Sequence, residues 1–145
     1  MKIVFCLHWP SRDSKSRLFK FKASQELFQD YLKRINGFCP TQTVSSLPNS
    51  GVIWICEREK KSKLLGSEDL AEKLKEVLSS GQKQLTIIIG GADGFTEEEL
   101  KDLNPALRWS FGPMTLPHEL AAVVAAEQVY RAFCILHNHP YHHGH

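Results

Sequence analysis

The chain of 145 residues has no long apolar run, and this absence limits where the protein can work. No segment approaches the roughly 20 consecutive apolar residues of a membrane-spanning helix. Residues 1–7 are too few for the apolar part of a secretory signal, so we expect no export. The four cysteines are scattered without a Cys-x-x-Cys pair. Buried, reduced thiols and a cytoplasmic location are therefore favoured over a disulfide-stapled protein.

Several common catalytic and binding signatures are also absent. Without a Gly-x-Ser-x-Gly segment, a hydrolase nucleophile has no support. Residues 90–94 are rich in glycine but form neither a Gly-x-Gly-x-x-Gly pattern nor a P-loop, which disfavours a polyphosphate ligand. The tail from His137 onward contains five histidines but no partner cysteine, and we expect no metal there.

Length and composition indicate one ordinary globular domain covering residues 1–145. The chain is 42% hydrophobic and 23% charged, and its net charge is +2. That charge is uneven, because eight of the 18 Lys and Arg residues but only three of the 16 acidic residues precede residue 36. A polyanion, if one binds, should meet this N-terminal segment.

Alternating apolar patterns predict an α/β fold with a mostly parallel sheet flanked by helices. Strands are expected at residues 1–7, 41–45, 52–56, 84–89 and 107–111. Helices are expected from Ser24 to residue 35 and from Ser67 to Gly81, with both serines as N-caps. A short helix should begin at a capping box of Thr96 and Glu99.

The last helix should begin near residues 115–117 and end at about residue 136. Of the seventeen residues 120–136, fourteen are apolar, too many for a helix with one buried stripe. Such a helix must be covered on two sides. In so small a domain this suggests that one side meets a second subunit, and we predict a homodimer.

Two loops are candidates for a ligand site, since ligands of open α/β sheets bind beyond the carboxyl ends of the strands. The glycines of residues 90–94 would let backbone approach a ligand, but a plain tight turn is the favoured explanation for such a loop alone. Residues 112–117 form a proline-punctuated loop directly before a helix, which could present backbone groups to an adenine edge or could simply be a rigid connection. Glu127 and Arg131, four residues apart, could form an internal ion pair or bind substrate.

Four C-terminal segments together resemble a known family. They are Ile-Gly-Gly-Ala-Asp-Gly at 89–94, Pro-Met-Thr-Leu-Pro-His-Glu-Leu at 113–120, Tyr-Arg-Ala-Phe at 130–133 and His-Pro-Tyr-His at 139–142. They resemble the ribosomal RNA large subunit methyltransferase H family of the SPOUT superfamily, which methylates N3 of a pseudouridine in 23S ribosomal RNA with S-adenosylmethionine. The resemblance implies a C-terminal trefoil knot, a rare feature that base rates would never suggest, and a partner subunit that completes the RNA site.

The resemblance also implies roles for particular residues. The cofactor would contact Ile55, Gly91, Gly112, Pro113, Met114, Thr115, Leu116 and Pro117. RNA would contact His118, Glu127, Arg131, Arg12, Lys15, Arg17, Lys20 and Lys22. Tyr141 and His142 would form the catalytic neighbourhood, with His142 as a hypothetical proton acceptor and Tyr141 stacking on or orienting the base.

Three residues depart from the family pattern. Cys56 and Glu59 stand where the family usually has Asp and Gly, and His143 stands where it has Arg or Lys, which removes a permanent charge near the RNA. Two other functions remain open: a knotted RNA-binding protein without catalytic activity, and a small-molecule enzyme on a nucleotide-binding sheet.

Overall fold

The computed structural model describes residues 1–9, 18–57, 63–90 and 94–143. These residues contain one six-stranded sheet in the order β2-β1-β5-β3-β6-β4, and every neighbouring pair is parallel. The strands are β1 (Lys2–His8), β2 (Thr41–Val44), β3 (Val52–Cys56), β4 (Lys63–Leu64), β5 (Gln84–Gly90) and β6 (Leu107–Ser110). The parallel α/β fold expected from the sequence is confirmed.

The central strands form because their apolar runs are buried on both faces. In β5, alternate side chains enter two separate cores: Leu85, Ile87 and Ile89 join the larger one, whereas Ile88 joins the smaller. A strand covered on both sides needs a continuous apolar run instead of an alternating one. Only β4, two residues beside a charged segment, was not predicted.

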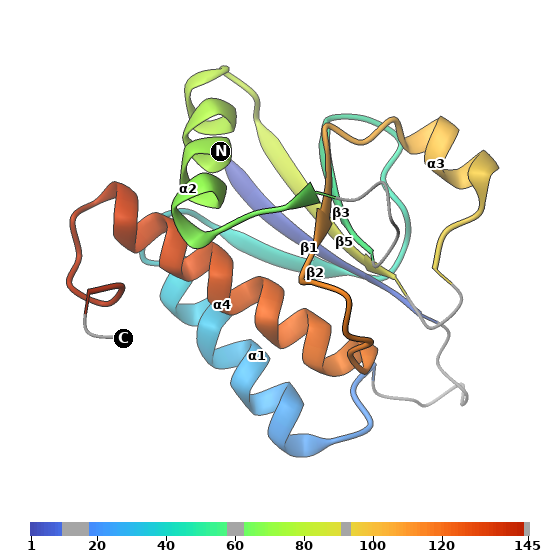
Figure 1. Ribbon diagram of the computed structural model, residues 1–145, viewed down its shortest axis with the longest axis horizontal. Helices are drawn as coiled ribbons and strands as arrows, with labels where there is room; N and C mark the ends of the chain where they lie inside the picture. Colours follow the sequence, from blue (N-terminus) through green and yellow to red (C-terminus); the bar gives the residue numbers. More distant parts are fainter. Residues whose placement is uncertain (10–17, 58–62, 91–93, 144–145) are drawn as a thin grey trace.

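The four helices lie on both faces of the sheet (Figure 1). They are α1 (Lys22–Ile35), α2 (Ser67–Ser79), α3 (Glu97–Leu103) and α4 (His118–Leu136). Residues of α1, α2 and α4 belong to the larger core, and α3 contributes Leu103 to the smaller core on the opposite face. The molecule therefore has three layers, with three helices on one side of the sheet and one on the other.

Helix α4 is covered on two sides, as its composition required, but by this chain's own helices. It lies between α1 and α2 on the sheet (Figure 1) and buries Val123, Val129 and Phe133, among others. The apolar composition of α4 therefore does not require a second subunit, because α1 and α2 already cover its two sides. The homodimer itself stays a prediction.

Two predicted N-caps are wrong because tertiary contacts replace local ones. Helix α1 begins at Lys22, before Ser24, and the N–H of its N-cap Phe21 donates to Glu119 Oε1 at 3.0 Å. Glu119 is 5% exposed, and its carboxylate suits the positive end of α1. In α2 the N-cap is Gly66, which frees the Ser67 hydroxyl for a contact with α4.

The capping box of α3 and the glycine that ends α2 are borne out, whereas α4 begins at His118 with Pro117 as its N-cap and without the expected hydroxyl cap. The capping box of α3 forms as expected, with Thr96 Oγ1 accepting from the Glu99 N–H and Glu99 Oε1 accepting from the Thr96 N–H. Gly81 follows the end of α2 with φ +78°. Cys6, Cys39, Cys56 and Cys134 are all free thiols. Among the described residues, no helix is long and apolar enough to span a bilayer.

Candidate functional site

The carboxyl ends of the parallel strands meet at one edge of the sheet. Strand pairing aligns His8 of β1 with Gly90 of β5, and Cys56 of β3 with Trp109 of β6. Leu64 of β4 lies opposite Ser110 of β6. In a parallel sheet this edge is where ligands bind.

A cleft of about 460 Å³ opens beside the carboxyl ends of β4 and β6. Its volume falls in the range of small-molecule sites. The walls combine apolar and aromatic side chains with three polar ones, and they come from β4, α2, β6 and α4: Leu64, Leu65, Gly66, Ser67, Trp109, Ser110, Phe111, Val124 and Gln128.

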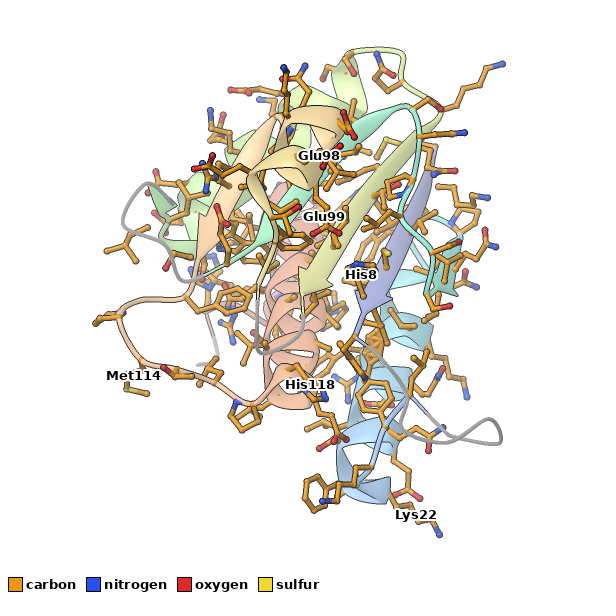
Figure 2. All side chains as sticks on the ribbon, turned by 90° about the vertical axis from the view of Figure 1, so that its right-hand side faces the viewer. His8, Lys22, Glu98, Glu99, Met114 and His118 are labelled. Atoms are coloured by element: carbon orange, nitrogen blue, oxygen red, sulfur yellow. The ribbon has the colours of Figure 1, made fainter. Side chains whose placement is uncertain are left out.

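The proline-punctuated loop begins directly at this cleft. Gly112 has φ +111°, a conformation that side chains rarely adopt, and its N–H donates to Ser110 Oγ at 3.1 Å. The loop then projects outward, with Met114 71% exposed near its outer end (Figure 2). It returns to α4 at Pro117, the N-cap of that helix. An exposed loop beside a cleft that begins in a conformation reserved for glycine is a candidate ligand-binding loop.

Two predicted cofactor contacts, Ile55 and Gly91, do not belong to that loop. The Ile55 side chain is fully buried in the smaller core, so only its backbone could face the carboxyl edge. The missing Cβ of Gly90 makes room for the ring of Phe95, and Gly94 has φ +67°, a conformation that favours glycine. Packing and backbone conformation thus explain these two glycines without a ligand. Gly91 lies outside the described residues.

Four predicted residues meet in one polar cluster on α4 and the C-terminal tail. The Glu127 carboxylate accepts from Arg131 Nη2 at 2.7 Å and Arg131 Nε at 3.0 Å, and from Tyr141 Oη at 3.0 Å. Arg131 Nη1 lies 3.1 Å from His142 Nδ1. The Glu127 and Arg131 side chains are 15% and 14% exposed. The expected ion pair is confirmed, and it also holds the tail against α4.

The protonation states within this cluster follow from its contacts. Burial raises the pKa of Tyr141, and hydrogen bonds to Tyr31 and Glu127 raise it further, so Tyr141 remains a hydrogen-bond donor at neutral pH. A guanidinium can only donate, so His142 Nδ1 accepts from Arg131. A neutral His142 ring therefore carries its proton on Nε2, which lies 3.7 Å from Glu68.

His118 is separate from that cluster. It begins α4, and its ring centroid lies 4.4 Å from that of the buried Trp9 (Figure 2). Thirteen residues of helix separate it from Arg131, or about 20 Å. Lys20 and Lys22 are exposed near the start of α1. Arg12, Lys15, Arg17 and the atypical Glu59 lie outside the described residues.

Sequence reasoning named none of the nine residues that line the cleft as a site residue, and two of them, Ser67 and Gln128, connect it to the polar cluster. Ser67 Oγ donates to Gln128 Oε1 at 2.7 Å, and Gln128 Nε2 donates to Glu127 Oε2 at 2.7 Å. Gln128 interrupts an apolar helix immediately after Glu127, and a polar residue at such a position was the available signal. The serine was interpreted only as a helix cap.

A family model described as predicted SPOUT methyltransferase matches residues 44–142. The chain belongs to the SPOUT methyltransferases. The matched part of this SPOUT methyltransferase contains the cleft, the loop at 112–117 and the polar cluster through His142.

Curated relatives define the family more narrowly. The chain is 37% identical over 137 residues to ribosomal RNA large subunit methyltransferase H of Koribacter versatilis, covering 87% of this chain and 92% of that protein. A protein of the same name from Psychrobacter sp. is 45% identical over 92 residues, covering 63% of this chain and 54% of that protein. The chain is thus a member of the ribosomal RNA large subunit methyltransferase H family, as its motifs indicated.

A solved methyltransferase from Legionella pneumophila, in complex with the bound cofactor SAM, is 16% identical with a TM-score of 0.44. The alignment covers 91% of this chain and 66% of that one. The family assignment does not depend on this likeness.

Proposed function

We propose that this protein transfers a methyl group from S-adenosylmethionine to N3 of a pseudouridine in 23S ribosomal RNA. The observation that carries the proposal is the matched region itself, in which the cleft, the loop at 112–117 and the polar cluster lie within one family model. Unpaired cysteines and the ribosomal substrate fit action in the cytoplasm.

The cleft and its loop suit an adenosyl sulfonium. Trp109 and Phe111 supply aromatic surface that attracts a cation, and Ser67, Ser110 and Gln128 supply a few polar groups in an otherwise apolar wall. Gly112, Pro113, Met114, Thr115, Leu116 and Pro117 would contribute backbone donors and acceptors, as would Ile55 and Gly91. When bound, S-adenosylmethionine supplies an electrophilic methyl group.

The protein has to position the pseudouridine base against the methyl donor and to remove one proton from it. The pseudouridine N3 proton must leave as the methyl group arrives. If it is on the order of three pK units less acidic than a histidine conjugate acid, its removal costs about 4 kcal/mol, which positioning and a positive local field can offset. Arg131 supplies such a field.

His142 is the proposed proton acceptor, and the structure sets a condition on that role. The lone pair of Nδ1 is engaged by Arg131, so the two side chains must separate before the ring can accept a proton. RNA phosphates would draw Arg131 away, with Lys20, Lys22 and His118 and the more N-terminal Arg12, Lys15 and Arg17 as further contacts. Tyr141 would then orient the base by stacking or by its hydroxyl.

We further propose that the chain forms a homodimer in which the partner's tail completes the RNA site, and that the C-terminal region is threaded as a trefoil knot. In one chain, the outer part of the cofactor loop and the tail are separated by most of α4. An experimental structure traced through residues 58–62 and 91–93 would decide the knot.

Radiolabelled methyl transfer tests the activity. Ribosomes that lack the modification should gain label, located at a single pseudouridine. Cofactor binding without transfer to ribosomes or free ribosomal RNA would point to a small-molecule substrate. No binding at millimolar cofactor would point to an RNA-binding protein without catalytic activity.

A further inference from the structure

Polar contacts join the cleft to the C-terminal tail in a ring. Ser67 of α2 donates to Gln128, Gln128 donates to Glu127, and Glu127 accepts from Arg131. Arg131 contacts His142, whose Nε2 lies 3.7 Å from Glu68, the residue next to Ser67. The ring therefore starts and ends in the first turn of α2 and passes through α4 and the tail.

Within this ring, Glu127 uses its two oxygens for different neighbours. Oε2 accepts from Gln128 on the side of the cleft. Oε1 accepts from Arg131 and Tyr141 on the side of the tail. A carboxylate held at both oxygens cannot turn freely, so the Gln128 amide sets the direction in which Oε1 presents itself to Tyr141 and Arg131.

The orientation of the Gln128 amide is itself fixed. Its oxygen accepts the Ser67 hydroxyl, and its nitrogen donates to Glu127. The reversed amide would place its NH₂ group at Ser67 and its oxygen against the Glu127 carboxylate, which repels it. The amide satisfies both neighbours at once because it carries a donor and an acceptor.

We propose that Gln128 is a positioning residue for methyl transfer, holding the tail residues Tyr141 and His142 against α4 through Glu127. This inference rests on the proposed function for its catalytic meaning. Its structural content, that Gln128 orders the tail, does not depend on that function. Because Gln128 also lines the cleft, a cofactor bound there meets the same side chain that orders the tail.

Gln128→Glu is the decisive variant. The substituted side chain has the same shape, but in its ionised form it cannot donate to Glu127 and adds a like charge beside it. Val124→Ala is the matched control, because Val124 lines the same cleft one helical turn earlier with an apolar side chain. Ser67→Ala tests the next contact in the ring.

Three measurements distinguish positioning from simple packing. Hydrogen exchange of the backbone amides of His139, Tyr141, His142 and His143, without cofactor or RNA, should accelerate about tenfold in Gln128→Glu, less in Ser67→Ala and hardly in Val124→Ala. Nitrogen NMR should show neutral His142 protonated on Nε2 in the wild type, and a mixture of tautomers in Gln128→Glu. With substrates, kcat of Gln128→Glu should fall about tenfold while cofactor affinity changes less than about threefold.

Unchanged tail exchange and kcat in Gln128→Glu would overturn the inference, as would equal loosening of the tail in Val124→Ala. A wild type that transfers no methyl group would defeat the proposed function instead. In that event the exchange comparison, which needs neither substrate, still decides whether Gln128 holds the tail.

Discussion

Tyr141 and His142 make different contacts in the polar cluster, so their roles can be tested separately. Tyr141 donates to Glu127, and its ring lies 4.9 Å from the Arg131 guanidinium carbon, so it contacts both halves of the ion pair. His142 contacts Arg131 alone within that pair. Removing the hydroxyl of Tyr141 therefore tests orientation, whereas removing the imidazole of His142 tests proton transfer.

We expect Tyr141→Phe and His142→Ala to remain folded and to lose activity. A proton acceptor is typically worth about 10² or more in rate, so His142→Ala should fall by at least that factor. Tyr141→Phe should fall less, and its free energy of unfolding should drop by about 0.5 to 1.5 kcal/mol for the lost hydrogen bond.

Single-turnover methyl transfer and urea denaturation provide these measurements. His137→Ala is the control, since it removes an exposed tail histidine whose ring instead lies beside Phe38. Wild-type rates in both test variants would remove the catalytic assignment.

Glu99 makes stability depend on pH at the start of α3. The hydrogen bond from the Thr96 backbone lowers the pKa of Glu99, and nearby His8, 3.4 Å away, also favours the charged carboxylate. Because the folded pKa lies below the unfolded one, the cap contributes fully above the ordinary glutamate pKa. Its contribution is lost as pH falls through the lowered folded pKa.

The free energy of unfolding should therefore decline in that acid window more steeply for the wild type than for Glu99→Gln, whose amide does not titrate. The whole cap is worth about 0.5 to 2 kcal/mol. Denaturation between neutral pH and the acid window measures the slope. Glu98→Gln, in the same turn and exposed, should keep the wild-type slope; identical slopes in all three proteins would contradict the role given to Glu99.

At the scale of elements, the β6 to α4 connection requires a glycine conformation where a ligand should bind. Gly112 and Gly81 both have positive φ, +111° and +78°, and a Cβ added to either would meet nothing within 4 Å. They differ in place, since Gly112 begins the candidate cofactor loop and Gly81 follows α2. The pair separates backbone strain from ligand binding.

Gly112→Ala and Gly81→Ala should each lower the free energy of unfolding by about 1 to 3 kcal/mol, the usual cost of a Cβ in such a conformation. Only Gly112→Ala should weaken S-adenosylmethionine binding, by about tenfold or more as the loop shifts. Calorimetry and thermal melting provide both measurements. Equal affinities in the two variants would show that the loop does not hold the cofactor.

At the scale of the whole molecule, a dimer could bring the loop at 112–117 of one subunit to the C-terminal tail of its partner. If each active site takes the cofactor loop from one subunit and the tail from its partner, two defective proteins can complement each other. We pair His142→Ala with Gly112→Val, a β-branched residue that the positive φ excludes. Circular dichroism should first show that each variant is folded.

Co-refolding the two variants should restore about a quarter of wild-type activity, because half of the dimers are mixed and each has one complete site. If loop and tail act within one chain, no mixed dimer has a complete site and the mixture stays inactive. Analytical ultracentrifugation checks the dimer, and a monomer at micromolar concentration would contradict the assembly.

The local sequence determined the parallel sheet, the capping box of α3 and the two-sided burial of α4, because apolar runs and cap residues act within a few neighbours. The resemblance singled out Glu127, Arg131, Tyr141 and His142. Their meeting in one cluster depends on the tail folding back over α4, which no local pattern encodes.

Only the tertiary structure decided which side chains bond the first residues of α1 and α2. It also decided which residues link the cleft to the tail. Glu119 accepts from the N–H of Phe21 at the start of α1, 98 residues away in the sequence. Ser67 does not cap its own helix but donates to Gln128, 61 residues away. Local propensity favoured Ser24 and Ser67 as caps because it counts only nearby partners. A buried amide or carboxylate binds whichever donor the packing brings to it, and that choice depends on the whole arrangement of α1, α2 and α4 on the sheet.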